Sequence, residues 1–253
     1  MIIIKRANEL ALMREGGKIL ATTMREVSAA IQPGKSSPRQ LDDLALKTIR
    51  AHGAEPSFLG YKGFPAAACI SRNDVVVHGI PDDQPLEEGD IVGLDFGVHY
   101  KGFHTDSAWT FPVGKISEQA QRLLNVSKEA LFQGIAKAKV GGTVGDISSA
   151  VQKYVESMRY SVVRDLVGHG IGKRLHEEPS VPNFGRPGRG ERLRAGMTIC
   201  IEPMVNEGGW EVTTDSDGWT MRTADGKLSA HFEHTVAITA EGPILLTAGE
   251  EPL

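Results

Sequence analysis

Cysteine is scarce in this 253-residue chain, which contains only Cys69 and Cys200. The two lie far apart and form no CxxC pair, so the sequence predicts neither a disulfide framework nor a zinc ribbon. Long apolar runs are missing too. The opening isoleucines end at Lys5, too soon for a signal-peptide core, and no later stretch is long enough to cross a bilayer. A reduced, cytoplasmic protein without a membrane partner is therefore expected.

An excess of positive charge is also missing. The net charge of −4 gives no general electrostatic case for binding nucleic acid. The GIGKR segment at 170–174 lacks the GxGxxG spacing of a phosphate-binding loop. Four arginines gather at 185–194, where a solvated loop is the ordinary interpretation and a contact with the ribosome or the nascent chain is the sharper one. We expect no sequence-specific nucleic-acid binding, and the ribosome contact stays open.

Helical and strand-like patterns alternate along the chain. Apolar spacing and capping residues (Ser37, Ser117, and Thr143 with Asp146) predict helices, and short β-branched or alternating runs predict strands. The expected helices cover 8–31, about 38–52, 118–138 and 144–158, and the strands cover 66–110 and the chain after 160. This order predicts an α+β fold in one catalytic domain, 1–253, with similar halves of about 1–114 and 115–253 and no extra N-terminal domain. The echo of VVVHGIP at His78 in LVGHGIG at His169 supports the duplication.

Two aspartates occur inside otherwise apolar strand patterns in the first half. A hairpin with its tip at Tyr100–Lys101 would place Asp95 directly opposite Asp106, with both side chains on one face. Like charges at opposed positions destabilise a sheet, and the apolar neighbours argue against a solvated face. The pair therefore predicts a functional site.

The second half contributes Glu202 in MTICIEPMV and Glu233 in SAHFEHTVAIT, again inside apolar strands. Four buried carboxylates need compensation, which two divalent cations supply, and an imidazole completes the ligand set without adding charge. Oxygen ligands with one nitrogen suit Mn, Fe, Co or Zn. In GHGIGKRLHEEP, His169 and His176 are seven residues apart in a glycine-broken segment, whereas metal-binding helices usually carry their histidines three or four residues apart.

These residues and their motifs together resemble type I methionine aminopeptidases of the creatinase-like M24 family. The likeness covers essentially the whole chain, and its motifs are HGIPDD, LDFG, GHGIG, LHEEP, IEPM and FEHT. It implies the pita-bread fold, a pseudo-twofold antiparallel sheet core with flanking helices. It also implies a monomeric enzyme that removes the initiator methionine from nascent polypeptides with a small second residue.

The same resemblance assigns roles within a centre of two divalent ions. It makes Asp95 a ligand of one ion, His169 and Glu202 ligands of the other, and Asp106 and Glu233 bridges between them. Glu202 would also take a proton from the attacking water.

The resemblance gives other residues a part in substrate binding and catalysis. It assigns His78 and His176 to the substrate and to its tetrahedral intermediate. The residues expected to line a methionine-sized pocket are Tyr61, Phe64, Cys69 and Trp219. Phe58, Phe64 and Leu175 depart from residues that relatives can carry at these positions, which changes the pocket's shape while keeping it apolar.

Two further histidines, His104 and His231, each lie two residues before an expected ligand. Strand alternation turns them toward the same face, which leaves open a supporting role behind the ligands or a place at the rim.

Two rival functions remain at this stage. A proline-directed aminopeptidase or prolidase shares the fold and the ligands, but such enzymes usually carry a large additional N-terminal domain. A non-catalytic binding protein on the same fold would have lost ligands, whereas all five positions are filled here.

Overall fold

The computed structural model describes residues 2–249, in which a pair of helices followed by strands occurs twice. The first series comprises α1 (Ala7–Ala29), α2 (Pro38–Ala51), β1 (Glu55–Pro56), the 3-10 turn η1 (Tyr61–Gly63), β2 (Ala68–Arg72), β3 (Val75–Val77), β4 (Ile91–Tyr100) and β5 (Phe103–Pro112). The second comprises α3 (Glu118–Ile135), α4 (Val144–Ser157), β6 (Ser161–Val162), β7 (Val167–Gly170), β8 (Glu177–Pro182), β9 (Thr198–Ile201), β10 (Met204–Asn206), β11 (Val212–Thr214), β12 (Met221–Thr223), β13 (Ser229–His231), β14 (His234–Thr239) and β15 (Gly242–Leu245).

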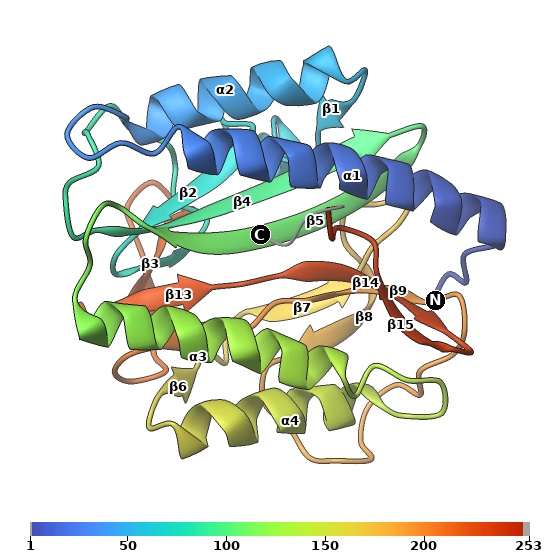
Figure 1. The fold of residues 1–253 in the computed structure, drawn as a ribbon. Coiled ribbons are helices and arrows are strands. Elements are labelled where there is room, and N and C mark those ends of the chain that lie inside the picture. The colour runs from blue at the N-terminus through green and yellow to red at the C-terminus, as the bar shows by residue number, and fades with distance from the viewer. Residues whose placement is uncertain (1, 250–253) are drawn as a thin grey trace.

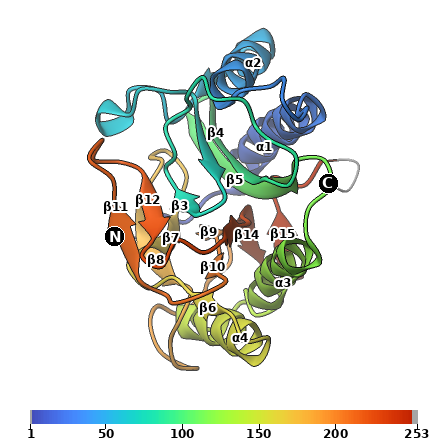
Figure 2. The same cartoon turned by 90° about the vertical axis from the view of Figure 1, so that its left-hand side faces the viewer.

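The strands lie between the two helical pairs. Figure 1 shows α1 and α2 on one side of the strands and α3 and α4 on the other, and the turned view in Figure 2 agrees. All strand pairs are antiparallel, in sheets ordered β1-β4-β2 (with β5 beside β4), β13-β10-β6, β11-β12-β3 and β15-β14-β9-β7-β8. The α+β pita-bread architecture expected from the sequence is confirmed.

The helices begin within one residue of the expected positions, whereas α1 and α3 end two and three residues earlier than expected. Ser37 caps α2 and Ser117 caps α3, each side chain accepting a hydrogen bond from the backbone amide three residues on. Thr143 and Asp146 form the expected capping box at the start of α4. Among residues 2–249, no helix combines the length and the apolar character needed to span a membrane.

The β4–β5 hairpin corrects the expected register. Its tip is Lys101–Gly102, so Asp95 pairs with Ala108 and Gly97 with Asp106. Lys101 and Gly102 have φ angles of 47° and 85°, the two successive positive values that a type I′ turn requires. The direct pairing of the two aspartates was therefore wrong. Because the shift is an even number of residues, both side chains still share one face, as diagonal neighbours.

Side-chain hydroxyls join β5 to the segment from His231 to Thr235. The Thr235 hydroxyl accepts from the backbone N of Asp106 (2.9 Å) and donates to its carbonyl (2.8 Å). The Thr110 hydroxyl bridges the backbone N and O of His231 in the same way, at 3.0 and 2.8 Å. We call this contact the seam. It holds strands from the first and second series together at the level of the acidic side chains.

Candidate metal centre

The five expected ligands come from both series of elements and line one cavity of about 320 Å³. Two lie on the β4–β5 hairpin, one on β7, one directly after β9, and one between β13 and β14. In that order they are Asp95, Asp106, His169, Glu202 and Glu233. The structure therefore brings together all five residues that the sequence singled out.

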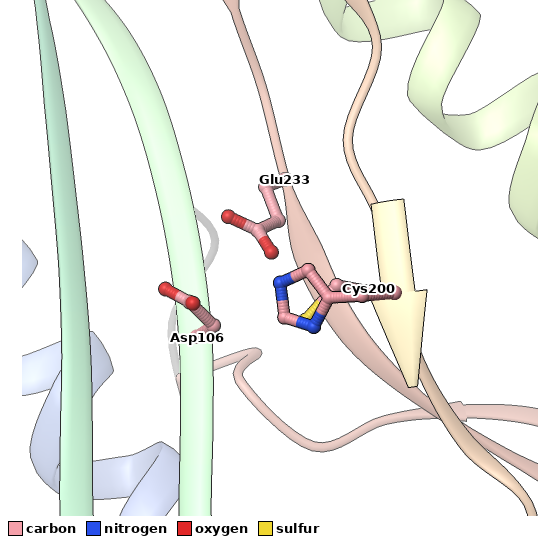
Figure 3. Close-up of side chains that lie close together, drawn as sticks. Asp106, Cys200 and Glu233 are labelled. Atoms are coloured by element: carbon pink, nitrogen blue, oxygen red, sulfur yellow. The ribbon is translucent and has the colours of Figure 1, made fainter. Parts of the chain in front are cut away.

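The seam fixes the two carboxylates expected to bridge. Beyond the Thr235 contacts to Asp106, Ser107 Oγ donates to the Glu233 carbonyl at 2.7 Å, and the Glu233 amide donates to the Ala108 carbonyl at 2.8 Å. Both backbones are thus held on each side of the gap that their side chains enter. Figure 3 shows the carboxylates of Asp106 and Glu233 reaching into the same space.

Burial dominates the electrostatics of the four carboxyl groups. It raises the pKa of Asp95 and of Glu202 to about 7, and it raises the pKa of Asp106 and of Glu233 well above the ordinary values. Neighbouring carboxylates raise the Asp106 and Glu233 values further. Such groups are costly to ionise in the absence of a nearby cation.

Three of these carboxyl groups also have a buried oxygen without a hydrogen-bond partner: Asp95 Oδ1, Asp106 Oδ1 and Glu233 Oε1. Unpartnered buried oxygens are rare in folded proteins and ask for an explanation. An imidazole lies beside the fourth carboxyl group, since His169 Nε2 is 3.6 Å from Glu202 Oε1. Oxygen ligands with one imidazole nitrogen fit divalent cations of the first transition row, which would supply the missing partner.

A cysteine belongs to this cluster, which the sequence analysis did not foresee. One ligand atom each from Asp106, His169, Cys200 and Glu233 lie within 4.8 Å of one another. Cys200 forms no CxxC pair, so no cysteine motif marked it as a ligand. Its position two residues before Glu202 in strand β9 was the available signal, because alternation places both side chains on one face.

His231 and His104, left open by the sequence, occupy different surroundings. His231 is buried, and its Nε2 lies 3.6 Å from Glu202 Oε2, beside the cluster. His104 shares a hydrogen bond of 2.8 Å with Ser57 Oγ and stacks on His99 at 4.4 Å between ring centroids. Only His231 therefore contacts an expected ligand.

His78 and His176 also line the cavity. The rings of His169 and His176 lie 4.2 Å apart, and His176 Nδ1 shares a hydrogen bond of 2.9 Å with the Tyr61 hydroxyl. Burial lowers the pKa of His78 to about 4, and partial burial together with neighbouring His169 lowers the pKa of His176. Both rings are therefore neutral at neutral pH, with one N–H each to donate.

The four side chains expected to form an apolar wall lie in the same cavity. Phe64 meets Trp219 edge-on at 5.2 Å between ring centroids, Tyr61 stacks on His176, and Cys69 is paired with Asp95 across β2 and β4. Burial raises the pKa of the Cys69 thiol well above its usual value. Cys69 therefore forms part of the wall and is poorly suited to act as a nucleophile.

A buried ion pair supports the segment that carries His176. Lys5 Nζ lies 2.6 Å from Glu177 Oε2, with side-chain exposures of 3% and 0%. The other carboxylate oxygen, Oε1, accepts from the Arg174 amide at 3.1 Å. A Cβ at Gly172 would lie 2.4 Å from Lys5 Cε, so the absence of a side chain there makes room for the lysine. No local pattern in the sequence links residues 172 positions apart.

The arginine-rich segment packs against the start of α4. The Gly188 amide donates to Asp146 Oδ1 at 3.0 Å, and the Val144 amide donates to the Glu191 carbonyl at 2.9 Å. Arg192 binds the Gly141 carbonyl at 2.9 Å. These contacts explain the local structure of the segment and leave its expected ribosome contact a prediction.

The chain is similar to known metallopeptidases in sequence and in structure. The sequence model of metallopeptidase family M24 matches residues 11–240. The chain is 54% identical to the methionine aminopeptidase of Clostridium perfringens, over 98% of this chain and 99% of that protein. The crystal structure of the methionine aminopeptidase from Rickettsia prowazekii superposes with a TM-score of 0.96 at 41% identity, over 98% and 100% of the two chains.

A more distant similarity concerns the fold alone. The prolidase from Pyrococcus furiosus matches with a TM-score of 0.79 at 23% identity, and the match covers 98% of this chain and 66% of the prolidase.

Proposed function

The chain belongs to metallopeptidase family M24, and on this premise we propose that it is a methionine aminopeptidase, a hydrolase that removes the initiator methionine from nascent proteins. Its similarity to methionine aminopeptidases over nearly the full length of both chains supports this assignment. The observation that carries it is the convergence of five ligand-type side chains in one cavity that also has an apolar wall.

Two divalent ions would occupy the cluster. Asp95 would bind one ion, His169 and Glu202 the other, and Asp106 and Glu233 both. The charge of −4 on four carboxylates would be balanced by the charge of +4 on two divalent ions. The three buried oxygens without a hydrogen-bond partner would each gain one. Co, Mn, Fe and Zn all suit this ligand set. When bound, such ions lower the pKa of water and polarise a carbonyl group.

The neutral imidazoles would orient and stabilise the reacting carbonyl. If the Tyr61 hydroxyl donates to His176 Nδ1, then Nε2 of that ring carries the proton and can donate to a carbonyl oxygen. His78, from the first series of elements, offers a second neutral donor at the same cavity. Glu202 would accept a proton from the attacking water.

The aromatic wall would select the methionine side chain. A thioether packs favourably against aromatic rings, and Tyr61, Phe64 and Trp219 offer three such surfaces beside Cys69. The cavity volume of about 320 Å³ lies in the range of small-ligand sites, and the expected preference for a small second residue is part of this proposal. The proposed partners are nascent polypeptide N-termini in the cytoplasm, with contact to the ribosome and a monomeric state as further expectations.

A peptidase assay with metal-loaded protein tests the assignment. We expect cleavage of Met-Ala-Ser and no cleavage of Ala-Pro peptides. Cleavage of the Ala-Pro peptides alone would move the protein to the proline-directed class that includes prolidases. No cleavage of either peptide by metal-loaded, folded protein would favour a non-catalytic binding protein.

Removal of a bridging ligand tests the metal centre. Asp106→Ala should lose bound metal, as measured by equilibrium dialysis. Its activity should fall by more than the roughly 100-fold that loss of a residue supporting the ligands costs. Asp83→Ala is the matched control, because the Asp83 side chain is 82% exposed. Full metal content and activity in Asp106→Ala would refute the centre.

A further inference from the structure

Cys200 lies on β9, directly opposite Thr235 of β14, and is fully buried. Its sulfur is 3.7 Å from the Thr235 hydroxyl, which also bridges the backbone of Asp106. In Figure 3 the sulfur is partly covered by an imidazole ring, and it lies on the side of the cluster away from Asp106. The seam that places the bridging carboxylates therefore also places the thiol.

The surroundings of this thiol are those of a ligand. Glu233 Oε1 and Asp106 Oδ1 are buried without a partner, in residues that are 2% and 4% exposed. With His169 and Cys200, these residues offer four donor atoms that lie within 4.8 Å of one another. Neighbouring donor atoms on one ion, with bonds of about 2.0–2.3 Å, are about 3–4 Å apart. Small side-chain rotations would bring the four onto one ion.

We propose that Cys200 is a sulfur ligand of the ion assigned above to His169 and Glu202, which Asp106 and Glu233 also bind. When the ion binds, the S–H bond breaks, the sulfur bonds to the metal and the proton passes to solvent. The inference rests on the proposed function for the presence of a metal centre. It adds a soft ligand to a set otherwise composed of oxygen and nitrogen, and so it favours Zn, Co and Cd over Mn.

The chain contains only two cysteines, which makes a spectroscopic test direct. We expect Co(II)-loaded wild-type protein to show a thiolate-to-cobalt charge-transfer band in the near ultraviolet. Cys200→Ser should lose this band while still binding Co(II) through the remaining ligands. Cys69→Ser is the matched control, because it removes the other buried thiol and should keep the band.

A second measurement needs no variant. X-ray absorption of the Zn-loaded wild-type protein should show a Zn–S distance of about 2.3 Å. In titrations, Cys200→Ser should bind Cd(II) at least about tenfold more weakly than wild type, with its Mn(II) affinity changed less than about twofold. Cys200→Thr serves in the same experiments if the serine variant does not fold.

Several results would overturn the proposal. They are a Co(II)-loaded wild type without the band, a band that survives in Cys200→Ser, and a Zn site without sulfur. Each would leave Cys200 as a hydrogen-bonding neighbour of Glu233 and leave the peptidase assignment intact. Failure of the wild type to bind any divalent ion would overturn the thiol ligand and the proposed metal centre together.

Discussion

Replacing Lys5 by methionine should destabilise the protein strongly, although Lys5 lies near the start of the chain. Its ammonium group is 2.6 Å from Glu177, and both side chains are almost fully buried. Removing one partner of such a pair leaves an uncompensated buried charge, at a cost of about 3–5 kcal/mol. In a domain of this size each kcal/mol corresponds to roughly 2–4 °C, so the melting temperature should fall by about 6–20 °C.

The same substitution should impair catalysis beyond its effect on stability. Glu177 directly follows His176 and accepts a hydrogen bond from the Arg174 amide. The Lys5–Glu177 pair therefore fixes the segment that carries the His176 imidazole. We expect a lower kcat/KM for Met-Ala-Ser at a temperature where the variant is fully folded. Adding Glu177→Gln to Lys5→Met should recover much of the stability, because the amide keeps an acceptor for Arg174 and removes the charge.

An exposed ion pair provides the control for this experiment. Lys101 lies 3.0 Å from Glu15, with side-chain exposures of 54% and 52%, and such pairs contribute about 0–1 kcal/mol. Urea unfolding of Lys5→Met and Lys101→Met gives the comparison. If Lys5→Met lost no more stability than Lys101→Met, the idea that the buried pair supports the His176 segment would be refuted.

Three other substitutions test separate parts of the structure. Tyr61→Phe removes the hydrogen bond to His176. It should lower kcat/KM about fivefold, equivalent to about 1 kcal/mol, without lowering the melting temperature. An unchanged kcat/KM would exclude a role for Tyr61 in orienting the His176 ring. Asp146→Ala should cost about 1 kcal/mol at pH 7 by removing half of the capping box with Thr143. Hydrogen bonds from Thr143 lower the pKa of Asp146, so this difference should be present above about pH 3.8 and shrink as the pH falls through the lowered value; a pH-independent difference in urea unfolding would contradict this account. Gly17→Ala should lower the melting temperature although alanine favours helices, because its Cβ would lie 2.0 Å from the Leu246 carbonyl oxygen; a stabilised variant would show that the backbone moves freely there.

Local signals in the sequence were sufficient for the helices. The caps at Ser37, Ser117 and Thr143 act within one turn, so spacing along the chain contains the information that fixes where these helices begin. The hairpin register depended on a subtler choice, namely which two residues adopt positive φ at the tip. Alternation along the strands survived that error, because the register shift was even.

Some residues of the candidate site could be recognised from the sequence, and others could not. Carboxylates inside apolar strands are conspicuous, so Asp95, Asp106, Glu202 and Glu233 could be recognised individually from the sequence, and the structure brings them together. Cys200 could not be recognised so easily, because a buried cysteine in a strand resembles an ordinary core residue. The roles assigned to the five ligands stay a proposal.

Long-range contacts account for what sequence reasoning missed. The Lys5–Glu177 pair joins residues 172 positions apart, and no periodicity or spacing marks either residue for the other. Its existence follows from how the segment before α1 passes the turn between β7 and β8, where Gly172 leaves space for the lysine. Such contacts are set by the packed fold as a whole.

The seam has a consequence for the order in which the protein is synthesised. Asp106 leaves the ribosome well before Thr235, the residue whose hydroxyl bridges its backbone amide and carbonyl. Until the last part of the chain emerges, the two aspartates of β4 and β5 have neither the opposite carboxylates nor the imidazole beside them. A growing copy of this protein therefore lacks the assembled cluster of acidic side chains until the segment that carries Thr235 has emerged.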